Sequence, residues 1–183
     1  MLRLTIWLSV VHVLAVPRGL HAGNLIPLTI EQLVQHSELI VYGTVLGTSY
    51  QRDTAGRIYT RVALNVAEVW KGAPIKQPVP IVIVHGGGTF GEKRVTVSDQ
   101  VDFQPGEEVV VFLVINPRGE GVSLGMSQGK FHIWSDRVTR QKYARNPFHG
   151  GDRTPGGVFM QSSATRPLLT LTGLKQRVTG ETQ

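Results

Sequence analysis

The sequence predicts a mainly β fold, a small closed barrel of five to six strands with an N-terminal helix and a short C-terminal helix. Two observations lead to this prediction. From Ile58 to Trp70 apolar side chains recur mainly at even positions, an alternation typical of a strand with one buried face. The stretch from Ser37 to Leu46 carries apolar side chains on both faces, which indicates a strand central to a closed or doubly covered sheet.

The first half of the predicted barrel contains a helix and a long hairpin. Thr29 and Gln32 form a capping box, so a helix is expected over 28–34, ending before Ser37. The two long strands follow, joined by a turn at Asp53–Gly56 in which glycine can take a positive φ. Glycine and proline at 72–74 end the second strand.

The second half contributes shorter strands, and one long stretch lacks any apolar period. The His85–Gly88 run predicts a sharply bent or mobile turn. The stretch 136–166 is rich in glycine, proline and arginine and is expected to be a peripheral loop or linker. Thr170 caps a short helix expected over 168–178. The strands are expected at 79–84, 95–97, 109–115, 122–125 and 130–134. A few strands with a helix across one end fit a barrel of the oligonucleotide/oligosaccharide-binding (OB) type.

The N-terminus has the pattern of a secretory signal peptide. A basic start is followed by thirteen largely apolar residues from Leu4 to Val16, too few to span a bilayer comfortably, and cleavage is expected after Ala22. We therefore predict a secreted or periplasmic protein with no transmembrane span after signal removal. The predicted organisation is a signal peptide at 1–22, a barrel at 23–135 and a basic tail rich in glycine and proline at 136–183.

The composition excludes cysteine chemistry and shows where along the chain the positive charge is concentrated. The chain has no cysteine, which excludes disulfides, lipid modification at cysteine and thiolate catalysis. From Arg137 onward there are eight basic residues and two acidic ones, so the basicity belongs to the predicted tail. Such a tail is usually solvated, but it can also contact acidic lipids, polysaccharide or nucleic acid. A surface module that grips polysaccharide through this tail is one alternative function.

Two sets of motifs carry a family resemblance over roughly 28–134. A helix, the stretch SELIVYGTV, a hairpin and RIYTRVALNVAEVWKG occur in the order found in the netrin-like domain, which this chain resembles. That family includes the tissue inhibitors of metalloproteinases. The chain also resembles a class of uncharacterised exported bacterial proteins through FQPGEEVVVFL at Phe103–Leu113 and GMSQGKF at Gly125–Phe131. The netrin-like pattern normally includes disulfide-bonded cysteines, one of them at the mature N-terminus, and this chain has none.

The resemblance implies an exported binding or inhibitory module, not an enzyme and without a cofactor, whose protein partner is an exported zinc protease. In the metalloproteinase inhibitors the free mature amine reaches the zinc of the target. The corresponding N-terminal segment before the first helix, which we call the lead, begins here at Gly23 and Asn24. A terminal amine with a pKa of about 8 loses its proton readily near neutral pH. We therefore expect the partner-binding residues to be Gly23 and Asn24 together with His85, Gly86, Gly87 and Gly88.

A small secreted serine hydrolase is the second alternative. His85–Gly88 matches an oxyanion loop, Gly121–Gly125 matches the nucleophile elbow around Ser123, and Asp136 and His149 follow in order. The elbow, however, requires a helix after the serine, and the residues that follow Ser123 are rich in glycine and then strand-like. This departure favours a binding module.

Metal and nucleic-acid sites have weaker support in the sequence. No pair of histidines has the spacing of a strong metal site. A barrel would allow His85 and His132 to approach each other near Asp99 or Asp102. The glycines after His85 lack the helix and lysine of a phosphate-binding loop. Aromatic side chains that could stack on bases are sparse. We therefore predict no metal ligands and no nucleic-acid partner.

Overall fold

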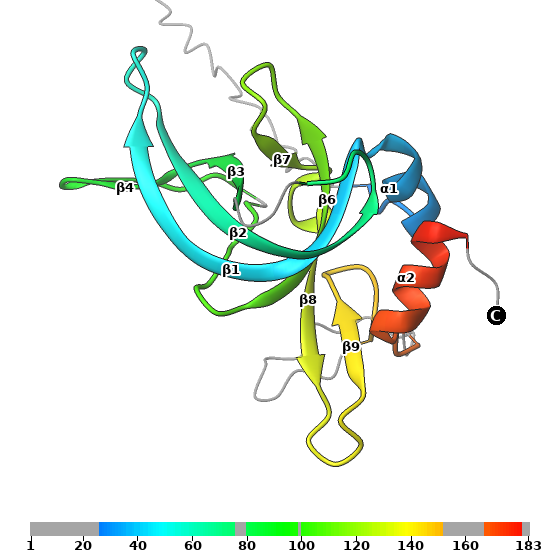
Figure 1. Ribbon diagram of the computed structural model, residues 1–183. Coiled ribbons are helices and arrows are strands. Elements are labelled where there is room, and N and C mark those ends of the chain that lie inside the picture. Colours follow the sequence, from blue (N-terminus) through cyan, green and yellow to red (C-terminus); the bar gives the residue numbers. More distant parts are fainter. Residues whose placement is uncertain (1–25, 76–79, 99, 152–166, 181–183) are drawn as a thin grey trace, which may run out of the picture.

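The chain folds into a mainly β structure with two α-helices and a short 3-10 helix (Figure 1). The computed structural model describes residues 26–75, 80–98, 100–151 and 167–180. Nine strands and three helices lie within them: α1 (Ile30–His36), β1 (Leu39–Arg52), β2 (Ile58–Lys71), β3 (Ile81–Gly86), β4 (Gly88–Phe90), β5 (Lys93–Val95), β6 (Glu108–Ile115), β7 (Gly121–Ser123), η1 (Met126–Gly129), β8 (Lys130–Ser135), β9 (Lys142–Arg145) and α2 (Leu171–Thr179).

Five of the strands form a ring of hydrogen-bonded neighbours. The order is β1-β2-β3-β7-β6, and β6 pairs with β1 again. Every pairing in the ring is antiparallel except that of β3 with β7, which is parallel and consists of the single pair Ile83 and Gly121. β8 and β9 extend the sheet from β6, while β4 and β5 form a separate two-stranded sheet. The predicted mainly β fold, the N-terminal helix and the short C-terminal helix are confirmed.

The β1–β2 hairpin is longer and more curved than the sequence indicates. β1 continues to Arg52, and the turn is held by Asp53 N, which donates to Arg57 O at 3.0 Å, while Gly56 takes a φ of 80°. Three register shifts interrupt the ladder between β1 and β2. Irregularities of this kind increase the local twist, and Figure 1 shows the hairpin curving around β3 and β4.

The core consists of two clusters on opposite faces of β1. Ile40 belongs to a helix-side cluster that also contains Leu33 of α1 and Leu174 of α2. Val41, its neighbour, belongs to an interior cluster inside the ring, together with Val62 and other strand residues. The prediction that the first long strand is covered on both faces is therefore confirmed as far as Val45, whereas Leu46, which the prediction included, is 55% exposed.

The segment after residue 135 differs from the sequence-based expectation. It was predicted to be a loop or linker, yet residues 142–145 form β9, which pairs with β8, and Ala144 N donates to Leu169 O at 2.8 Å. Only Ala144 of this four-residue strand is fully buried, so the strand has no apolar pattern to reveal it. α2 then packs on the helix-side cluster through Leu174 and Val178. The rest of the expected linker, 152–166, lies outside the described residues.

Candidate functional site

A groove of about 460 Å³ opens between the concave side of the β1–β2 hairpin and the chain that returns from β5 to β6. Its lining includes Thr48, Tyr50, Thr60, His85, Arg94 and Phe103. Thr48 and Tyr50 lie opposite Val62 and Thr60 in the hairpin, so the groove continues the inner face of the ring. Polar and aromatic side chains therefore surround an opening at the end of the apolar interior.

His85 lies in one wall of the groove and is held from two sides. The amide Nε2 of Gln100 lies 2.9 Å from the ring Nδ1, and the ring stacks on Phe103 with centroids 6.2 Å apart. Lys130 Nζ lies 4.8 Å from the centre of the Phe103 ring. These contacts join β3, the return segment and β8, so the orientation of His85 depends on the tertiary fold.

The three glycines after His85 form a bend between strands. Gly86 ends β3 and Gly88 begins β4, with Gly87 between them. Gly87 N donates to Ile58 O at 3.0 Å, and Gly87 O accepts a hydrogen bond from the buried Thr60 hydroxyl at 2.8 Å. The predicted bend is present, but the backbone groups of Gly87 are already used within the fold.

Gly88 is required where the bend passes the hairpin. Its φ is +131°, and a Cβ on it would lie 2.5 Å from Tyr50 Cδ1 and 2.8 Å from Thr60 Oγ1. An L side chain would therefore meet both strain and a clash. This close approach sets the start of the β4–β5 hairpin against the β1–β2 hairpin.

Gly23 and Asn24, the other expected partner-binding residues, lie outside the described residues. The chain just after them is anchored by Gln128, a side chain only 2% exposed. Its Oε1 accepts a hydrogen bond from Leu28 N at 2.6 Å, and its Nε2 donates to Ile26 O at 3.2 Å. His149 Nε2 lies 2.8 Å from Leu28 O. Hydrogen bonds from two distant side chains thus hold the residues before α1 in a chain that has no disulfide.

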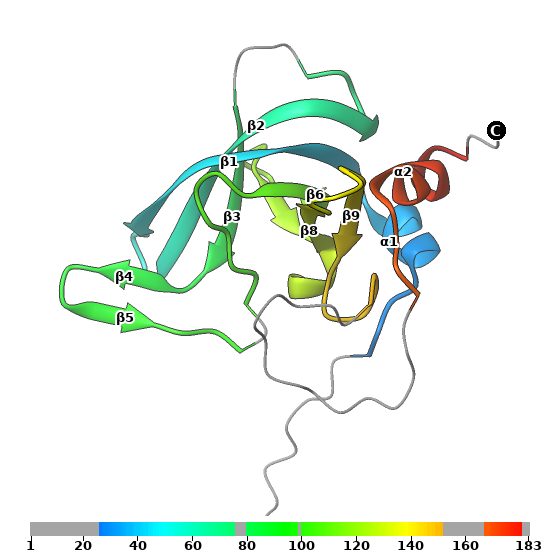
Figure 2. The ribbon, with the colours of Figure 1, turned by 90° about the horizontal axis from the view of Figure 1, so that it is seen from below.

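Sequence reasoning missed this role of Gln128, although the residue lies inside the GMSQGKF motif. A glutamine flanked by small residues is a weak signal, because its backbone partners are about a hundred positions away in the chain. α1 and the groove lie on opposite sides of the molecule, as Figure 2 shows for α1 and the β4–β5 hairpin. A surface that combines Gly23 with His85 stays a prediction.

The three side chains that the hydrolase hypothesis requires, those of Ser123, Asp136 and His149, form hydrogen bonds with other parts of the chain. The Ser123 hydroxyl donates to Met126 O at 2.7 Å, and the short strand β7 leads into the 3-10 helix η1 instead of an α-helix. Asp136 accepts hydrogen bonds from the backbone of the β8–β9 turn, including one from Thr139 N at 2.8 Å. His149 contacts the chain before α1, as described above. The hydroxyl proton of Ser123 is therefore directed at a backbone carbonyl, which cannot act as a general base.

His85 and His132, the two histidines considered for a metal site, have separate partners. His85 contacts Gln100, whereas His132 Nδ1 lies 2.8 Å from Glu107 Oε1, and Glu107 is also paired with Lys130 at 2.6 Å. Asp99 is outside the described residues. Among the residues that are described, no group of three or more His, Asp or Glu side chains is placed to hold a metal ion.

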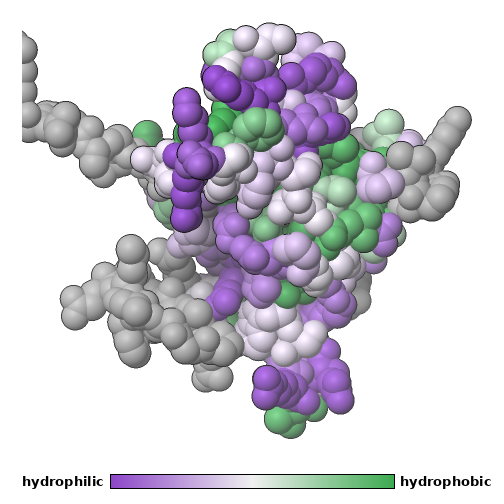
Figure 3. All heavy atoms as spheres, turned by 90° about the vertical axis from the view of Figure 1, so that its left-hand side faces the viewer, coloured by the Kyte–Doolittle hydropathy of each residue, from purple (hydrophilic) through white to green (hydrophobic). Residues whose placement is uncertain are grey.

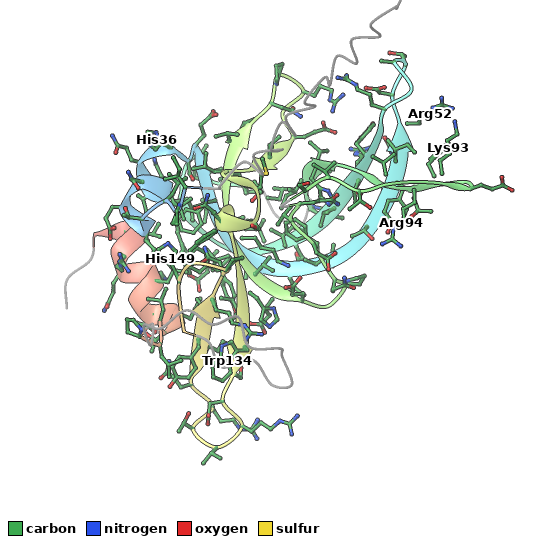
Figure 4. The ribbon with its side chains drawn as sticks, turned by 180° about the vertical axis from the view of Figure 1, so that it is seen from behind. His36, Arg52, Lys93, Arg94, Trp134 and His149 are labelled. Carbon is green, nitrogen blue, oxygen red and sulfur yellow. The ribbon has the colours of Figure 1, made fainter. Side chains whose placement is uncertain are left out.

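Two basic regions differ in how their charges are used. In the C-terminal part, Lys142, Lys175 and Arg177 pair with Glu108, Glu68 and Glu31. Beside the groove, Arg52, Lys93 and Arg94 are exposed and have no ion pair within the described part of the chain. Figure 4 shows these three on one side of the molecule, with His36 and His149 on the other.

Figure 3, which faces the groove side, shows hydrophilic side chains gathered over the tip of the β1–β2 hairpin at the top and over the β8–β9 turn at the bottom. The first of these regions adjoins the groove. Among the described residues, no helix combines the length and apolar character needed to cross a membrane. Comparison of the sequence with protein-family models and with curated proteins finds no match.

Proposed function

We propose that the chain is an exported, non-enzymatic binding module that restrains a protein partner, built on a netrin-like barrel of the OB type. The five-stranded ring supports a barrel, because β6 returns to β1 and the interior cluster fills the space within. The order of α1, a long strand and a long curved hairpin supports the netrin-like assignment. The single pair joining β3 to β7 is where this barrel is least completely closed.

The observation that carries the binding function is the groove. It opens on the interior of the ring, and its walls are fixed by side-chain contacts such as those of His85 with Gln100 and Phe103. A concavity with a few placed polar groups is the usual form of a small-molecule site, and here we propose that side chains of a protein partner enter it. The engagement of Ser123 with Met126 O supports a module that binds without reacting.

The partner that the netrin-like resemblance suggests is an exported zinc protease. Without cysteine, the lead that would carry the free amine of Gly23 must be held by other means. Gln128 and His149 hold its last residues at Ile26 and Leu28, which lowers the entropy lost when the lead is ordered in a complex. This anchoring supports an inhibitory role for the lead in addition to that of the groove.

A pair of tryptophan variants tests the groove. The side chain of Thr48 lines the groove. Thr48→Trp is expected to weaken binding to a panel of secreted zinc proteases at least tenfold, because the indole fills the space that the partner enters. Val138→Trp, at a residue 91% exposed in the distant β8–β9 turn, is the control and is expected to stay within twofold, with both affinities measured on immobilised protease. Equal affinity for both variants would remove the groove from the function, and no binding to any protease would remove the partner class.

A further inference from the structure

One side of β1 is an open sheet edge for half of its length. Pairing with β6 ends at Thr44, opposite Glu108, whereas pairing with β2 continues to Arg52. Within the described part of the chain, the segment Leu46–Arg52 therefore has a strand partner on one side only. We call this segment the β1 edge. Such an edge presents a row of backbone groups that can pair with another strand.

The register shows which backbone groups of the β1 edge are available. Asp53 N bonds to Arg57 O across the hairpin, and Ile58 O, opposite Arg52, bonds instead to Gly87 N on the far side of β2. Because antiparallel ladders alternate between bonded and non-bonded pairs, the N–H and C=O groups of Thr48, Tyr50 and Arg52 point away from β2. They are spaced every second residue, as the ladder of an added strand requires.

The β1 edge borders the groove. Thr48 and Tyr50 line the groove with their side chains, and Gln104 and Pro105 line it near Val45, where β1 last contacts the chain before β6. Leu46 and Tyr50 are 55% and 47% exposed. A strand added to this edge would send alternate side chains over the groove, while the side chains between them would lie on the outer face.

The charges near the β1 edge favour an acidic strand. Arg52 ends the edge and Arg94 lines the groove, and neither is paired with a carboxylate within the described residues. The carboxylates in this region are partly engaged: Asp102 accepts a hydrogen bond from Gln104 Nε2, and Asp53 is paired with Arg57. Glu92 is exposed at the turn between β4 and β5. Two guanidinium groups along one edge can each take a carboxylate in a bidentate manner.

We infer that the β1 edge binds an extended acidic segment of a protein partner as an added antiparallel or parallel strand. Backbone hydrogen bonds to Thr48, Tyr50 and Arg52 supply the affinity, and carboxylates facing Arg94 and Arg52 supply the selectivity. This inference rests on the proposed function, since it names the way in which the same groove receives its protein partner.

Alternately N-methylated peptides test the strand. The probe is a synthetic peptide of alternating Glu and Val, as long as the β1 edge, and its affinity for the full chain is measured by fluorescence anisotropy. N-methylation removes backbone donors from every second residue. Methylation at the odd positions and at the even positions gives two peptides, which we call the two methylation phases. One phase is expected to weaken binding at least tenfold, while the other leaves it within twofold, because only one of the two sets of N–H groups faces β1.

A charge reversal tests the selectivity. Arg94→Glu is expected to weaken binding of the same peptide at least tenfold, and Arg137→Glu, an exposed cation at the distant β8–β9 turn, to stay within twofold. Three results would overturn the inference: equal effects of the two methylation phases, equal binding of a Lys–Val peptide, or no binding of the Glu–Val peptide at millimolar concentration. Self-association through the β1 edge in light scattering would also overturn it, as would a sulfated polysaccharide that binds in an Arg94-dependent way while the peptide does not.

The two proposals can fail separately. A chain that binds the peptide with the expected phase dependence but binds no protease keeps the strand inference and loses the inhibitory function. A chain whose protease binding depends on Thr48, but which shows no phase dependence with the peptide, keeps the function and loses the strand.

Discussion

At the scale of single residues, Gly88 determines how closely the two hairpins meet. Gly88→Ala is expected to destabilise the protein by about 1–3 kcal/mol, because an alanine there must adopt a positive φ and its Cβ must displace Tyr50 or Thr60. Gly91→Ala is the matched control: its φ is also positive, at +59°, but nothing lies within 4 Å of the added Cβ. Urea unfolding of both variants measures the difference. A cost for Gly88→Ala no larger than that for Gly91→Ala would show that the close approach is not a constraint.

Residue-scale features of this site were predictable only where they are local. The glycine run after His85 predicts a bend, because glycine tolerates positive φ wherever it occurs in the chain. The contacts of Gly88 with Tyr50 and Thr60 bring together residues 38 and 28 positions apart, which no local pattern encodes. The same holds for Gln128, whose hydrogen bonds to Ile26 and Leu28 follow from the tertiary fold.

At the scale of elements, the C-terminal strand and helix are attached to the rest of the protein by apolar packing and three ion pairs. Glu31 pairs with Arg177, Glu68 with Lys175 and Glu108 with Lys142. The hydrogen bond from Arg177 lowers the pKa of Glu31, and that from Lys175, helped by Trp70, lowers the pKa of Glu68. Burial acts to raise the pKa of Glu108, but hydrogen bonds from Lys142 and Tyr42 outweigh it and the pKa is lowered.

These shifts predict a loss of stability in acid. A carboxyl whose pKa is lower in the folded state contributes stability above its ordinary value of 4.5, and this contribution is lost as the pH falls through the folded pKa. Because the pairs are largely exposed, each contributes only about 0.2–1 kcal/mol. The free energy of unfolding in urea should therefore drop by about 1–2 kcal/mol more between pH 6 and pH 3.5 in the native chain than in a triple variant with glutamine at 31, 68 and 108.

The control for this measurement is Glu92→Gln, at an exposed glutamate that makes no ion pair within the described residues. Its acid dependence should match that of the native chain. An unchanged pH dependence in the triple variant would show that the three pairs do not attach the C-terminal elements.

The elements differ in how far sequence reasoning could place them. α1 was predicted because Thr29 and Gln32 form a capping box, which the structure contains in full. β2 was predicted because its buried positions alternate over a long run. β9 was missed because it has four residues and one fully buried side chain, and it is stabilised by pairing with β8 and by the chain before α2.

At the scale of the whole molecule, the fold separates a helix-covered side from an open side. α1 and α2 cover one face of β1, and the groove with the β1 edge lies at the far end of the hairpin (Figures 1 and 2). The mainly β class followed from the alternation in two long strands. The predicted closed barrel rested on the number of strands and on the family resemblance, and neither encodes the strand order of the ring or its parallel contact between Ile83 and Gly121, which are 38 positions apart.

Hydrogen–deuterium exchange with and without a protein partner tests the central claim most directly. The account predicts slower exchange in the partner complex at the amides of Thr48, Tyr50 and Arg52 and in residues 93–98 and 100–105. The amides of Ser49 and Gln51, already bonded to β2, should change little, and α2 and the β8–β9 turn should not change. Protection confined to α1, α2 or the β8–β9 turn, with the β1 edge unaffected at saturating partner, would contradict the account.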